Sequence, residues 1–223
     1  RLEDAQRAET GPIQTIHGLC ERILRENAVE AGIDPEFEIL GTAQARSLEF
    51  EAITQAIVAA KEDSEYASAL IHIHSCQSGW KSNKLHGQLR NLVGSLVERM
   101  RSAGFDPQEL EANYSSPDSI LRFWKQELLA LLPEEVSSFA TDDTDYGWVQ
   151  GVRTQLKLMN YRVPSWLKFR QWQEEVDAAN DTCGLVWLAL SAWSYLDQIM
   201  VQRQEFDFTM LEAKAIDLLR ELA

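Results

Sequence analysis

The chain has 223 residues, of which 45% are hydrophobic and 25% are charged, so it is long enough and apolar enough to fold around a core. Its formal net charge of -14 excludes a protein that coats nucleic acid with its whole surface, but it does not exclude a local basic patch. The three cysteines lie far apart, which excludes a disulfide framework and favours reduced thiols in a cytoplasmic protein. The first residue is not methionine and no signal peptide is evident, so we expect either that the start was processed off or that the chain is an internal piece of a longer protein.

Apolar residues recur at helical spacing in five stretches, which begin near residues 16, 48, 85, 188 and 208. Ser116 followed by Pro117 predicts a helix start, and that helix should end before Pro133. The uncharged apolar stretch 182–196 is shorter than the roughly 20 residues of a membrane helix, so we expect a buried central helix there.

Three further signals concern the boundaries of elements. Pro164 followed by Ser165 predicts another helix start. Gly104 and Gly184 are expected near the ends of elements. Residues 13–15 are compatible with one short strand near the N-terminus, and residues 70–74 are ambiguous.

The chain is therefore predicted to be all-α, an irregular multi-helix fold with at most one short strand near the N-terminus. Residues 1–223 are expected to form a single helical domain. The acidic segment 137–145 is the best candidate for a long loop. That loop leaves open a division into two lobes, 1–136 and 146–223.

The most specific stretches are residues 13–25, IQTIHGLCERILR, and residues 31–40, AGIDPEFEIL. They resemble superfamily 1 DNA helicases of the UvrD/Rep/PcrA group, and more closely the AddA and RecB subunits of helicase-nucleases. That family carries T-[IF]-H-[SG]-[FL], then R-[IL]-L-R, then a turn with F-x-[IL]-L, in this order and at this spacing. A looser match is FDFTML at residues 206–211, and Gly41 departs from the family, where an aspartate usually follows the leucine.

The resemblance implies a fragment that corresponds to the helical 1B subdomain, an insertion in the first RecA-like domain. The sequence has no Gly-Lys and no Asp-Glu dipeptide, so the Walker A and Walker B residues are absent. We expect this piece to have no catalytic residues and to bind no cofactor by itself. ATP and Mg²⁺ are expected only for the parent enzyme, with DNA unwinding in repair and recombination as its role.

In the resembled family, the threonine and histidine of the first motif lie beside the single-stranded DNA track. The resemblance carries that role to Thr15 and His17. The alternative is a local structural role, in which His17 caps or packs against its own neighbourhood.

Two basic islands stand out against the acidic background, and we expect them to face duplex or forked DNA. The first holds Lys81, Lys84, Arg90, Arg99 and Arg101. The second holds Arg153, Lys157, Arg162, Lys168 and Arg170, interleaved with Tyr161 and Trp166 as candidates for base stacking. The alternative is a set of ordinary solvated helix faces with core aromatic residues.

Other constellations are weaker. His72, His74 and Cys76 lack an evident fourth ligand, so no metal site is predicted. The expected partners are DNA and the RecA-like domains of the same parent chain, and no membrane is expected. A second hypothesis is a helical docking domain for a nuclease partner subunit, which an acidic surface with exposed tryptophans would favour. A third is a stand-alone helical regulator.

Overall fold

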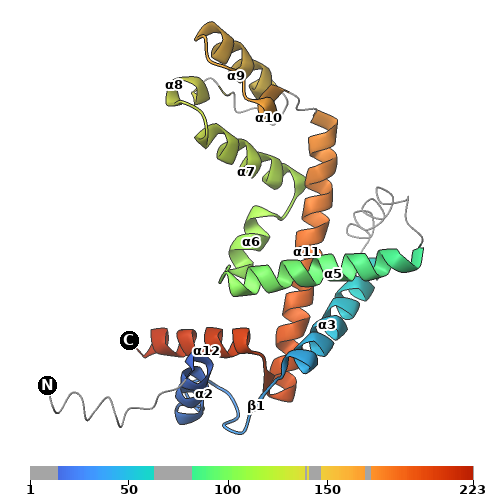
Figure 1. Cartoon of the computed structure of the whole chain (residues 1–223), viewed down its shortest axis with the longest axis vertical. Coiled ribbons are helices and arrows are strands. Elements are labelled where there is room, and N and C mark those ends of the chain that lie inside the picture. The colour runs from blue at the N-terminus through green and yellow to red at the C-terminus, as the bar shows by residue number, and fades with distance from the viewer. Residues whose placement is uncertain (1–14, 63–81, 139, 141–146, 169–171, 223) are drawn as a thin grey trace, which may run out of the picture.

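The computed structural model describes residues 15–62, 82–138, 140, 147–168 and 172–222. Most of these residues are helical, which confirms the predicted all-α class (Figure 1). The helices are α2 (Ile16–Glu26), α3 (Thr42–Glu62), α5 (Ser82–Ser102), α6 (Pro107–Asn113), α7 (Pro117–Ala130), α8 (Glu134–Ser137), α9 (Gly147–Leu158), α10 (Ser165–Lys168), α11 (Trp172–Arg203) and α12 (Phe208–Glu221).

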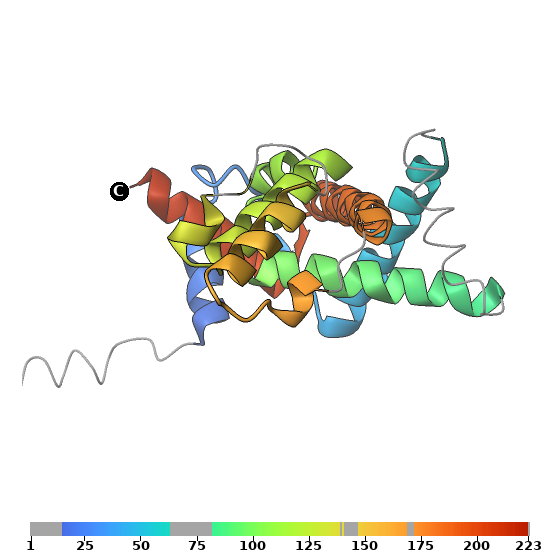
Figure 2. The same cartoon turned by 90° about the horizontal axis from the view of Figure 1, so that it is seen from above.

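Helix α11 is the axis of the molecule, because helices α3, α5, α6 and α7 all pack against it. Its 32 residues correspond to about 48 Å of helix. The short helices α9 and α10 lie at one end of this axis, and α2 and α12 lie at the other (Figure 1). Seen from above, α3 extends to one side of α11 and α12 to the other (Figure 2).

Local sequence explains several helix starts. Ser116 accepts a hydrogen bond from the amide of Ser119 at 3.2 Å, and Pro117 occupies the first helical position. Asp207 likewise accepts from the amide of Met210 at 2.7 Å and caps α12. At the end of α5, Gly104 has φ +70°, a conformation that favours glycine. The expected boundaries at Pro117 and Gly104 are therefore confirmed.

Two features differ from expectation. Gly184 is a buried residue in the interior of α11, because packing of this helix against its neighbours offsets a glycine cost of about 1 kcal/mol. The strands are β1 (Glu38–Ile39) and β2 (Glu205–Phe206), which pair in parallel. Their pairing joins two segments that are 167 residues apart in register, and such short strands leave no period-two signal in the sequence.

The core has three parts. The first lies around α2, β1, β2 and α12, the second lies where α3 and α5 pack on α11, and the third lies under α9 and α10. The third contains Val136 and Val149, which come from either side of the acidic segment. Packing thus joins the two sides of that segment, and the division into lobes stays a prediction. The expected strand at residues 13–15 and the ambiguous segment 70–74 fall mainly outside the described residues.

Candidate functional site

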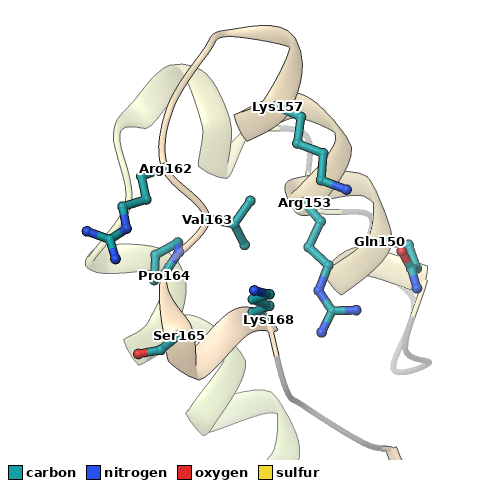
Figure 3. A pocket seen from close by; sticks show the side chains of 8 residues that line it. All are labelled: Gln150, Arg153, Lys157, Arg162, Val163, Pro164, Ser165 and Lys168. Atoms are coloured by element: carbon teal, nitrogen blue, oxygen red, sulfur yellow. The ribbon is translucent and has the colours of Figure 1, made fainter.

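The second basic island forms a pocket of about 850 Å³ at the α9–α10 end of the molecule (Figure 3). Three segments supply its walls: helix α9, the connection that follows it, and helix α10. The lining residues are Gln150, Arg153, Lys157, Arg162, Val163, Pro164, Ser165 and Lys168. We refer to this feature as the cationic pocket.

Buried apolar side chains hold α9 and α10 together beneath the cationic pocket. Val149, Val152 and Leu156 of α9 and Leu167 of α10 belong to one core cluster. Arg153 donates hydrogen bonds from Nε (2.7 Å) and Nη2 to the carbonyl oxygen of Leu167. Since a hydrogen bond from a charged donor is stronger than a neutral one, this contact fixes α10 against α9.

The described charged side chains that line the cationic pocket are all positive. Arg153, Lys157, Arg162 and Lys168 contribute four positive charges, and no carboxylate is among the described lining residues. Lys157, Arg162 and Lys168 are exposed. In Figure 3 the ammonium group of Lys168 lies near the centre of the view, whereas the guanidinium of Arg162 extends outward from the rim. This arrangement suits an anion with several oxygens, such as a backbone phosphate.

Sequence reasoning missed one polar member of the cationic pocket. Gln150 lies on α9 three residues before Arg153 and seven before Lys157. These spacings put the three side chains on one helical face, so a helical wheel of residues 147–158 would have found it.

Tyr161 is half exposed in the connection but does not line the cationic pocket. Trp166 lies in α10, but its side chain is not among those the structure describes. Arg170 lies outside the described residues. The role of these three residues stays a prediction.

Of the first basic island, the structure describes the side chains of Arg90, Arg99 and Arg101, and these three lie in different surroundings. The guanidinium carbon of Arg90 lies 4.4 Å from the centroid of the Phe50 ring. Arg99 is exposed near the end of α5, whereas Arg101 is an almost buried structural residue. Lys81 lies outside the described residues, and the side chain of Lys84 is not described.

Arg101 ties α5 to the start of α12. Its Nη1 and Nη2 atoms lie 2.6 Å and 3.0 Å from the two carboxylate oxygens of Asp207. The side chain of Arg101 is only 8% exposed, so its guanidinium is committed to this pair rather than presented to a ligand.

Thr15 and His17 both make contacts within the protein at the other end of the molecule. The hydroxyl of Thr15 accepts a hydrogen bond from the amide of Gly18 at 3.2 Å and caps α2. The His17 ring stacks on Phe208 with 4.3 Å between centroids, and its Nε2 lies 3.1 Å from Oε1 of Glu212. The packing of His17 fits its structural alternative, and a DNA contact by Thr15 or His17 stays a prediction.

Asp197 lies beside the Arg101–Asp207 pair, with 3.9 Å between its Oδ1 and Nη2 of Arg101. Burial raises the pKa of Asp197 from 3.8 to about 6, although Arg101 partly offsets this rise and Asp207 adds to it. A raised carboxyl pKa favours the folded state below pH 3.8, and this contribution is lost as the pH rises through about 6.

Asp197→Asn should therefore stabilise the protein at pH 7 and leave its stability nearly unchanged at pH 4. Since 41% of the side chain is exposed, solvent screening reduces the expected gain. It should be about 1 kcal/mol in the free energy of unfolding. Urea denaturation of both proteins at pH 4 and pH 7 measures this. A gain that is the same at both pH values would refute the role of this ionisation.

No cluster of three or more metal-ligating His, Cys, Asp or Glu side chains occurs among the described residues. The segment with His72, His74 and Cys76 lies outside them. In the described part of the chain, no helix combines the length and the apolar character needed to cross a membrane.

The comparisons with known proteins agree with the motif at residues 13–25. The model of the UvrD/REP helicase N-terminal domain matches residues 1–221. No curated protein and no solved structure matches the chain. Since the family model covers nearly the whole chain, the protein belongs to the UvrD/REP helicase N-terminal domain family.

Proposed function

We propose that the chain is a DNA-contacting accessory subdomain, of the helical 1B type, in an ATP-dependent helicase related to the AddA and RecB subunits. Its work is mechanical: it guides DNA while other parts of the parent enzyme bind ATP and Mg²⁺. The RecA-like domains of the same parent chain are its proposed neighbours, in a cytoplasmic enzyme of DNA repair and recombination.

The observation that supports this proposal best is the cationic pocket. Four cations line one pocket of a chain whose net charge is -14, and three of them, Lys157, Arg162 and Lys168, are exposed. Positive charge that is concentrated in this way against an acidic background attracts phosphate locally, whereas the rest of the surface repels it. The contact is expected to be independent of base sequence, because phosphates carry no sequence information.

The docking hypothesis for a nuclease partner receives less support. An acidic surface with exposed tryptophans would favour it. The net charge of the chain is -14, but Trp124, Trp148, Trp187 and Trp193 are all buried or half-buried. These four are the tryptophans whose side chains the structure describes. Exposed apolar residues do occur on α2 and α12, at Ile16, Leu19, Ile216 and Leu219.

Reversing two charges of the cationic pocket tests the proposal. Lys157→Glu with Arg162→Glu should weaken the binding of forked DNA by about tenfold or more, because two phosphate contacts are lost and two repulsions are gained. Fluorescence anisotropy of a labelled fork at low salt measures the affinity.

The matched control reverses Lys61 and Arg220, two exposed cations outside the cationic pocket, and therefore changes the net charge equally. The control should lose much less affinity. Equal losses in both double variants would mean that only the net charge matters, and the proposal would fail.

A further inference from the structure

A second pocket, of about 380 Å³, lies between α3 and α5. Helix α3 contributes Arg46, Glu49 and Phe50, and helix α5 contributes Arg90, Asn91 and Glu98. We refer to it as the aromatic pocket. It is distinct from the cationic pocket, because the two share no residue and lie on different helices (Figure 1).

Phe50 is a large aromatic residue in this lining, and 53% of it is exposed. The guanidinium of Arg90 covers the ring at 4.4 Å from its centroid. Nε of Arg90 is buried and has no hydrogen-bond partner among the described residues. The contact with the Phe50 ring is therefore the main described interaction of the Arg90 guanidinium. A ring that is supported in this way on one side and half exposed is a platform for a second flat group.

The charges in the aromatic pocket balance, unlike those of the cationic pocket. Arg46 and Arg90 oppose Glu49 and Glu98, so the lining offers no net attraction to a phosphate. Burial raises the pKa of Glu49, and the neighbouring Glu98 adds to this rise. Asn91 is exposed and supplies an amide that can both donate and accept hydrogen bonds. A neutral, flat ligand with polar edges suits this lining best.

Close packing of the two helices keeps the aromatic pocket in shape. A Cβ atom added at Gly94 would lie 2.7 Å from Oε1 of Glu49. Because such a contact is too short, glycine at this position lets the Glu49 side chain lie directly against α5. The Glu49 carboxylate thus lies against α5, in the same lining as Phe50.

We propose that the aromatic pocket binds one nucleobase of single-stranded DNA, which stacks on the Phe50 ring while Asn91 and the carboxylates face its polar edge. The inference rests on the proposed function, because DNA is the ligand that brings a base to this surface. It adds a base-contacting site to the phosphate-contacting one.

The placement of the two pockets suits a strand that leaves a duplex. The cationic pocket precedes the start of α11 at residue 172, and α5 packs on α11 around residue 189. Residues 172 and 189 of α11 are about 25 Å apart along the helix axis. The duplex backbone is then held at one level of α11 and an unpaired base at another.

The test compares two 15-mer oligonucleotides, oligo(dT) and an oligomer of abasic sugar phosphates that has the same charge. The wild type should bind oligo(dT) more tightly than the abasic oligomer. Phe50→Ala should lose roughly fivefold or more in affinity for oligo(dT) and nothing for the abasic oligomer. Phe50→Trp retains a ring and should retain the preference, whereas Phe50→Leu should lose it.

Since position 50 is exposed, all three variants should fold, and far-UV circular dichroism checks this. The proposal is overturned if Phe50→Leu binds oligo(dT) as tightly as the wild type, or if the wild type binds neither oligomer more tightly than the other. Charge reversal at Lys157 and Arg162 should weaken the binding of both oligomers alike. That result tests the phosphate contact separately, so a failure of the proposed function is distinguishable from a failure at Phe50.

Discussion

Replacing Arg101 by methionine is expected to lower the free energy of unfolding by about 3–5 kcal/mol. The side chains of Arg101 and Asp207 are only 8% and 15% exposed, so the substitution leaves the Asp207 carboxylate without its partner in a poorly solvated place. Asp207 also caps α12 through the amide of Met210. The loss should therefore be accompanied by fraying of the last helix.

Arg203→Met is the matched control for Arg101→Met. Arg203 also contacts both oxygens of one carboxylate, that of Glu51 at 2.9 Å and 3.0 Å, but both side chains are exposed. A solvent-exposed pair contributes about 0–1 kcal/mol, so this variant should differ little from the wild type. Urea denaturation measures both. Losses of equal size would contradict the structural role of the Arg101–Asp207 pair.

Replacing Phe206 by alanine is expected to cost about 3–5 kcal/mol of folding free energy. Phe206 lies in β2, is completely buried, and tilts against Phe37 with 5.3 Å between ring centroids. The substitution removes this contact and leaves a cavity where the N-terminal and C-terminal segments of the chain meet.

Phe105→Ala serves as the comparison, because Phe105 is 53% exposed and leaves no enclosed cavity. Its expected cost is about 1 kcal/mol or less. Thermal denaturation followed by circular dichroism compares the two variants. If they melt at the same temperature, the packing around β1 and β2 does not stabilise the fold as inferred.

Local patterns in the sequence predicted most of the fold. The start of α7 was predicted from Ser116 and Pro117, because a cap and a proline act on their own neighbourhood. The prediction that Gly184 lies near the end of an element was wrong. The packing of α11 against other helices outweighs the preference of a single residue. The pairing of β1 with β2 could not be predicted, because it depends on a contact between segments that are 167 residues apart.

The candidate site was predicted only in part, because local sequence patterns do not show contacts between residues that are far apart in the chain. Lys157 and Lys168 are close in sequence, so a basic island at 153–170 already indicated that their charges meet. Arg101 looked identical to them in sequence, but its partner Asp207 lies 106 residues away. Only the fold shows which cations face each other and which are bound to a carboxylate.

The salt dependence of binding to forked DNA tests most directly whether the cationic pocket binds backbone phosphates. The logarithm of the binding constant should fall linearly with the logarithm of the salt concentration, with a slope of about -0.9 for each phosphate contacted. The slope for Lys157→Glu with Arg162→Glu should be shallower than that of the wild type by about 2. The slope for Lys61→Glu with Arg220→Glu should match the wild type. Equal slopes for all three proteins would contradict phosphate binding at the cationic pocket.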